Sequence, residues 1–209
     1  MPDSAVLVTF VVVVLGAFVV PGPAVLLVFA RTGQGGRRIG ILTGLGIATG
    51  DFVHTTFAAV GLSAVLMTSA VAFNIVKLAG AGYLIYLGVR AMLAKPSGDP
   101  SLPKVALVTP AKAYWQAILV EVLNPKTALF FLAFLPLFVQ PERGSTFMQF
   151  TLFGLIFVVM SAVYTTLLAL SVQPLGHLFR RLSWLTRWQG KIIGAIFIAL
   201  GVKVAFQHQ

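Results

Sequence analysis

The sequence predicts an all-α membrane protein with about six membrane-spanning helices. Hydrophobic residues make up 58% of the 209-residue chain and charged residues only 10%, against roughly a quarter in soluble proteins. The mean hydropathy is +0.97. A hydrocarbon core about 30 Å thick needs roughly 20 apolar residues per helix. Six stretches meet this length: about 4–29, 40–65, 68–92, 114–138, 147–172 and 187–206.

The longest gap between these spans falls near 93–112 and reads as a linker. Three prolines, two serines and a glycine lie within eight residues there, a composition that cannot sustain a helix. We therefore expect an N-terminal three-helix unit at 1–92, a cytoplasmic linker at 93–112 and a C-terminal three-helix unit at 113–209. No Lys or Arg precedes Arg31, so the first apolar run is interpreted as a retained helix rather than a signal peptide.

The formal net charge of +10 arises from 15 Lys and Arg against 5 Asp and Glu, and its distribution indicates orientation rather than nucleic-acid binding. The second gap has no basic residue and the fourth has only Arg143. By the positive-inside rule the odd gaps face the cytoplasm, so both termini lie outside it, in a multi-pass protein of the bacterial inner membrane. The basic residues of the odd gaps are Arg31, Arg37, Arg38, Arg90, Lys95, Lys104, Lys112, Arg180, Arg181, Arg187 and Lys191.

The two halves share a pattern that predicts an inverted repeat. With three helices each, related halves must lie in opposite orientations in the membrane. A shift of 110 positions places residues of the second span on identical residues of the fifth, although apolar composition alone inflates such matches. The matched residues are Leu42, Gly44, Leu45, Val53, Thr55, Thr56 and Ala59 with Leu152, Gly154, Leu155, Val163, Thr165, Thr166 and Ala169.

Proline interrupts the first and fourth spans at corresponding places, at Pro21-Gly22-Pro23 and at Asn124-Pro125. Proline lacks an N–H and clashes with the preceding turn, so both helices should break or kink there. Paired broken helices indicate a transporter binding site, because the N-terminus of each continuing half-helix can accept a carboxylate. The alternative is a pair of packing kinks.

Five charged or titratable residues within the spans are further candidates. Asp51 lies near the middle of the second span, where an ionised carboxylate costs about 3 kcal/mol. His54, one turn away, or Lys77 in the third span could compensate for it, so Asp51 is either a proton carrier, a partner for a substrate ammonium, or half of a structural pair. Glu121 and Lys126 flank the second break and are expected to face the bundle interior, unless Glu121 reaches water.

Several chemistries have no support in the sequence. The chain has no cysteine and only 3 histidines, and it lacks nucleophile, zinc-protease and P-loop motifs. We therefore expect neither an enzyme nor a cofactor. Hydroxyl residues such as Ser161 and Tyr164 are interpreted as helix-packing groups.

Taken together, these motifs resemble the LysE/RhtB family of amino-acid exporters. The resemblance rests on the first break, the glycine- and arginine-rich stretch 35–40, Gly50-Asp51-x-x-His54, the run from Lys77 to Gly88, and Leu123-Asn124-Pro125-Lys126. It implies efflux of amino acids or their derivatives, threonine- or homoserine-like or basic, driven by the proton gradient. The partners would be a small amino-acid-like substrate, protons and the lipid bilayer, and a homo-oligomer is left open.

Two other functions remain open at this stage. A divalent-cation exporter could use Asp51 and His54, although two ligands are few and Lys77 would repel a cation. A non-transporting membrane scaffold would need the polar residues only for structure.

Overall fold

The computed structural model describes residues 2–19, 22–64 and 107–181, the last nine of them by backbone alone, and single positions between 71 and 93 and between 191 and 202. The spans expected at 68–92 and 187–206 lie mostly outside the described residues, as does most of the expected linker.

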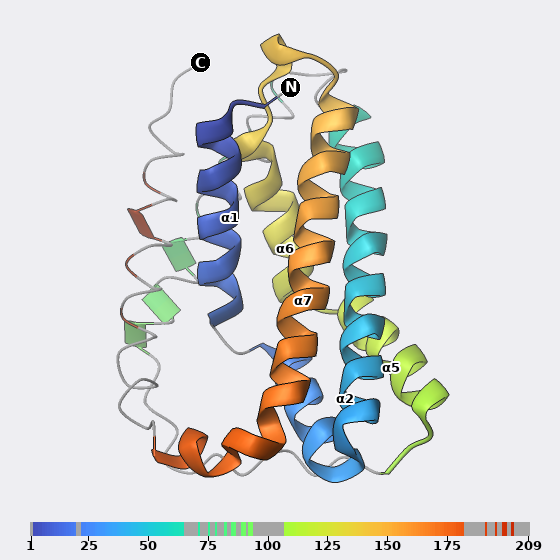
Figure 1. Cartoon of the computed structure of the whole chain (residues 1–209). Coiled ribbons are helices and arrows are strands. Elements are labelled where there is room, and N and C mark those ends of the chain that lie inside the picture. The colour runs from blue at the N-terminus through green and yellow to red at the C-terminus, as the bar shows by residue number, and fades with distance from the viewer. Residues whose placement is uncertain are drawn as a thin grey trace.

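The first helix is broken where the prolines predicted a break. Helix α1 (Ser4–Val19) is followed by α2 (Pro23–Phe57), and the two are bent by 58°. Within α2 the chain reverses at Gly36, whose φ of 81° and ψ of 175° suit a residue without a Cβ. Its second arm continues into a short π-helical segment, η1 (Ala58–Leu62), and Figure 1 shows this arm rising beside α7.

The second half repeats the broken arrangement. Helix α5 begins within the last three residues of the expected linker because Pro110 suits a first helical position and the Thr109 side chain accepts a hydrogen bond from the Lys112 N–H at 3.4 Å. Helices α5 and α6 are bent by 50° at Asn124. The elements are α5 (Pro110–Val122), α6 (Pro125–Phe134), η2 (Leu135–Phe138), η3 (Pro141–Arg143) and α7 (Thr146–Arg181).

The second arm of α2 is central and packs mainly against α7 and α5. Helix α7 buries one face at helical spacing, yet its opposite face is also apolar, with Val159 61% and Leu167 57% exposed. A helix that is apolar all round suits a lipid environment. Within the described residues one helix can cross a membrane by itself, at Thr146–Val172, and counting each bent pair as one span gives three. The full count of six stays a prediction.

Phenylalanine rings form the apolar core that joins α1, α6, η2 and α7. Phe10 is fully buried and lies 5.1 Å from Phe138 and 4.9 Å from Phe153, measured between ring centroids. Tilted and edge-to-face pairs of this kind add about 0.5–1.5 kcal/mol each beyond area burial. This cluster attaches α1 to the second half of the chain at the end opposite to the turn at Gly36.

Two glycine–threonine contacts join the second arm of α2 to α7. A Cβ at Gly44 would lie 2.7 Å from the Thr165 hydroxyl, and a Cβ at Gly154 would overlap the Thr55 side chain. In one contact the glycine lies on α2 and the threonine on α7, and in the other contact the reverse holds. All four residues are among those matched by the shift of 110. The pattern is what a two-fold relation between the helices would produce, although the inverted repeat itself stays a prediction.

Replacing Gly154 with alanine is expected to destabilise the protein by about 1–3 kcal/mol, because the added methyl group forces the two helices apart. The measurement is thermal unfolding of the detergent-solubilised protein. A second substitution, Thr55→Ala, should recover most of the loss. Gly16→Ala is the matched control, since a Cβ there meets nothing within 4 Å. Equal stability of the Gly154 and Gly16 variants would contradict this account of the interface.

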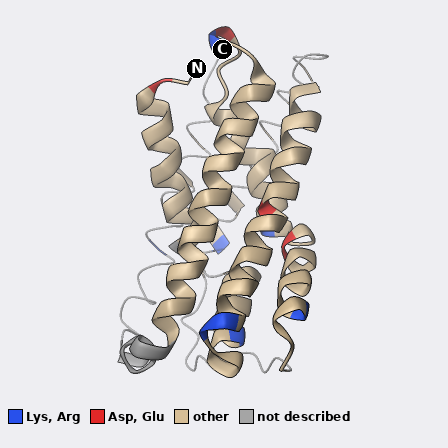
Figure 2. Cartoon of the chain, turned by 45° about the vertical axis from the view of Figure 1, so that its right-hand side comes forward, with Lys and Arg blue, Asp and Glu red and all other residues tan. Residues whose placement is uncertain are grey.

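Charged groups lie at both ends and near the middle of the described helices. The basic residues of α2 and α5 lie toward one end, as Figure 2 shows. At the other end Asp3 forms an ion pair with Arg143 at 3.5 Å, which places the N-terminus beside the loop between α6 and α7. The first gap and the N-terminus therefore lie at opposite ends, as expected for a first span that crosses the membrane.

Candidate functional site

The first break exposes the N-terminus of α2. Gly22 precedes the helix in an extended conformation, and no side chain of the described residues caps it. Pro23 has no N–H to donate, and the N–H groups of Ala24 and Val25 belong to the first turn, where no intrahelical carbonyl is in reach. These groups and the helix dipole make this end of α2 favourable for an anion.

The same break changes the hydrogen bonding of the carbonyl groups at the end of α1. Pro21 lies outside the described residues, but its lack of an N–H means that the Ala17 carbonyl has no helical donor. That oxygen accepts a hydrogen bond from the Lys126 ammonium at 3.4 Å, and the Phe18 carbonyl accepts one from the Tyr164 hydroxyl at 3.0 Å. Side chains of α6 and α7 thus hold the broken end of α1.

The second break is organised by Asn124, which caps α6. Its side-chain oxygen accepts a hydrogen bond from the Lys126 N–H at 3.1 Å. Its amide nitrogen donates to the Glu121 carboxyl group at 3.3 Å and to the Thr127 hydroxyl at 3.1 Å. Unlike α2, α6 therefore starts with its own cap in place, so the two predicted anion sites are not equivalent.

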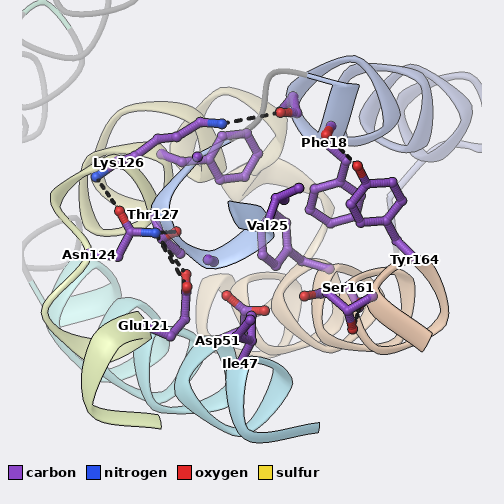
Figure 3. Close-up of a pocket in the computed structure, with 16 residues that line it drawn as sticks. Phe18, Val25, Ile47, Asp51, Glu121, Asn124, Lys126, Thr127, Ser161 and Tyr164 are labelled. Carbon is purple, nitrogen blue, oxygen red and sulfur yellow. Dashed lines mark hydrogen bonds between the residues drawn. The ribbon is translucent and has the colours of Figure 1, made fainter. Parts of the chain in front are cut away.

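A cavity lies between the two breaks (Figure 3). Its empty volume is about 550 Å³, part of it open to the surroundings. Five predicted site residues line it: Gly22, Asp51, Glu121, Asn124 and Lys126. The other lining residues are Ala17, Phe18, Ala24, Val25, Ile47, Thr127, Phe130, Phe157, Ser161, Tyr164 and Thr165.

Two carboxyl groups share one side of this cavity. Asp51 and Glu121 are 1% and 2% exposed, and Glu121 lies close enough to act electrostatically on Asp51. Figure 3 shows Ser161 facing Asp51 from α7. The Asp51 Oδ2 atom is buried and has no hydrogen-bond partner among the described residues. Because a buried oxygen of this kind is costly to leave unpaired, Asp51 is suited to receive a donor from a ligand.

His54 lies one turn beyond Asp51 and contacts α5. Its Nε2 atom is 2.9 Å from the Glu121 carbonyl oxygen, which can only accept, so Nε2 carries the hydrogen in this arrangement. The ring also stacks on Phe131 at 5.8 Å. Lys77, the other candidate partner of Asp51, lies outside the described residues.

Comparison with known proteins decides the family. Residues 15–208 match the family model of the LysE type translocators. The chain belongs to this family. It is therefore a member of a transporter family, as the motifs around both breaks indicated. Its location in a membrane is confirmed, whereas the inner membrane and the orientation of the termini stay predictions.

Curated relatives of this LysE type translocator cover nearly its whole length. An uncharacterized membrane protein of Pseudomonas aeruginosa is 30% identical over 203 residues, which are 94% of this chain and 93% of the relative. A protein of Salmonella typhimurium named leucine efflux protein is 26% identical over 197 residues, with the same coverage. An uncharacterized membrane protein of Bacillus subtilis is 29% identical over 193 residues, 88% of this chain and 91% of the relative. No solved structure matches the chain.

Several residues that line the cavity of the translocator are not among those that the sequence singled out. Ser161 and Tyr164 were interpreted as packing groups, although the shift of 110 put them opposite Asp51 and His54 and could have drawn attention to them. The aromatic residues Phe18, Phe130 and Phe157 had no distinguishing signal, because phenylalanine is common throughout the apolar spans. For the cation-exporter alternative, the described part of the translocator contains no group of three or more His, Cys, Asp or Glu side chains able to hold a metal.

Proposed function

We propose that this LysE-family translocator exports amino acids across the bacterial inner membrane in exchange for protons. The observation that carries the proposal is that Gly22 and Asp51 line one cavity, and that within the described residues the start of α2 has no side-chain cap and the Asp51 Oδ2 atom has no hydrogen-bond partner. An α-amino acid carries one anionic and one cationic group, and the cavity provides a complement for each. The Salmonella relatives named leucine efflux proteins support the same substrate class.

In this proposal the substrate carboxylate binds at the start of α2 and to the Lys126 ammonium. Lys126 lies directly against Gly22, since a Cβ there would be 3.2 Å from the Lys126 Cδ atom. A carboxylate makes a stronger, charge-assisted bond to an ammonium than the neutral Ala17 carbonyl does. The arriving substrate would therefore draw Lys126 away from the end of α1.

The substrate ammonium binds at Asp51 in the same proposal, and Asp51 carries the proton in the opposite direction. One carboxyl oxygen cannot hold a proton and a substrate ammonium together, so the two would alternate. Glu121 is already engaged by Asn124 at 3.3 Å, which leaves Asp51 as the exchangeable group. Rocking of the two halves about the contact between α2 and α7 would give access to each side in turn.

The orientation belongs to the proposal as well. The end of α2 and α5 that bears Arg37, Arg38 and Lys112 would face the cytoplasm, and the end with Asp3 and Arg143 would face outward. Labelling of a tag at the N-terminus in intact cells tests this arrangement, which predicts access from outside the inner membrane.

A dipeptide-feeding assay tests export itself. Cells that express the protein are expected to release amino acids from an imported dipeptide faster than cells that carry the empty vector. Val25→Trp should reduce the release to vector level, because the indole would fill the cavity without removing a charged group. Leu26→Trp is the matched control, since Leu26 is the next residue and is 42% exposed on the outer face. Equal release from all four strains would overturn the proposed function.

A further inference from the structure

We infer that the exported amino acid has an uncharged, apolar side chain, which is recognised by an aromatic wall formed by Phe18, Phe130 and Phe157. This inference rests on the proposed function and specifies its substrate class. The wall lines the cavity and is assembled from three helices, α1, α6 and α7, that are distant in the sequence.

The three rings form one continuous surface with Phe157 at its centre. The centroid of Phe157 lies 5.3 Å from that of Phe18 and 5.0 Å from that of Phe130. Phe18 is in turn stacked on Tyr164 at 5.1 Å, and the Tyr164 hydroxyl holds the Phe18 carbonyl. Phe157 is 5% exposed. The wall is therefore held in place before any substrate arrives, as expected for a recognition surface.

Among the described residues that line the cavity, each charged side chain already has a partner in the proposed complex. Lys126 faces the carboxylate, Asp51 faces the ammonium, and Glu121 is engaged by Asn124. The aromatic wall adds no acidic group that could neutralise a lysine or arginine side chain. Because a charge without such a partner is costly to bury, the wall favours an apolar side chain over a basic one.

Efflux rates of different amino acids, measured with the purified protein in proteoliposomes, test this inference. Loaded vesicles are expected to release leucine, isoleucine or valine at least about tenfold faster than lysine or threonine at equal concentration. In Phe157→Ala the ratio of leucine to alanine efflux should fall by about tenfold, the range expected when apolar contact with a substrate side chain is lost. If this variant does not fold, Phe157→Leu should lower the same ratio more modestly.

Phe153→Ala is the matched control, because Phe153 lies one turn earlier on α7, in the core beside Phe10, and does not line the cavity. It should leave the leucine-to-alanine ratio unchanged. Efflux of lysine or threonine as fast as leucine, or an unchanged ratio in both Phe157 variants, would refute the apolar class and leave amino-acid export standing. Absence of efflux for every amino acid would instead contradict the proposed function.

Discussion

Lys126→Met is expected to raise the substrate concentration for half-maximal efflux by about 10- to 100-fold. Methionine keeps the length and apolar stem of lysine but removes the ammonium group. The variant thus loses a hydrogen bond to a charged partner, which contributes about 1.5–3 kcal/mol, and 1.4 kcal/mol corresponds to a factor of ten. Concentration-dependent efflux from proteoliposomes measures the change.

Two further variants separate the roles of Lys126. Lys112→Met removes an exposed ammonium far from the cavity and should behave as wild type. Tyr164→Phe removes the hydrogen bond to the Phe18 carbonyl, 3.0 Å long in the structure, and keeps the ring stacked on Phe18. The contrary outcome is that Tyr164→Phe impairs efflux as severely as Lys126→Met does. The hydrogen bonds to the end of α1 would then explain the effect of both variants, and a role of Lys126 in carboxylate binding would be contradicted.

The positions of the two helix breaks could be predicted from the sequence because proline acts locally. A missing N–H and a steric clash affect the preceding turn whatever the rest of the chain does, and α2 and α6 indeed begin at Pro23 and Pro125. Periodicity did not predict where α5 begins, since Pro110 lies outside the apolar run and its helix depends on the cap at Thr109. Helix ends in polar segments are set by such caps rather than by hydropathy.

The partners of the charged residues could be predicted only in part. Asp51 was identified because a charge in an apolar span is unusual, but hydropathy contains no information about which helix packs against it. The structure places Glu121 and Ser161 beside Asp51, and His54 against the Glu121 main chain. The shift of 110 maps Asp51 onto Ser161, but by itself it did not predict that the two side chains lie together.

The difference between the two breaks also required the structure. Both have a glycine or asparagine before a proline, and from the sequence both are equally plausible carboxylate sites. Asn124 has a side chain that caps its own helix at 3.1 Å, whereas Gly22 has none. A single side-chain hydrogen bond thus decides which helix end remains available to a ligand.

Asp51→Asn is expected to abolish efflux driven by a pH gradient without destabilising the protein. Asparagine has nearly the same shape but neither accepts a proton nor pairs with a substrate ammonium. Because Asp51 lies beside Glu121, removal of one of two neighbouring buried carboxyl groups relieves repulsion and the cost of burying a charge, about 3 kcal/mol on insertion scales. The variant should therefore unfold at the same temperature as wild type or above it.

The experiment combines pH-gradient-driven efflux from proteoliposomes with thermal unfolding in detergent. Glu142→Gln, an exposed substitution in η3, is the matched control and should leave both readouts unchanged. Glu121→Gln should retain part of the gradient-driven efflux, because Glu121 is engaged by Asn124 and does not exchange its partner in the proposed cycle. Gradient-driven efflux at wild-type rates in Asp51→Asn would exclude Asp51 as the proton carrier. A large fall in its unfolding temperature would instead assign Asp51 a structural role.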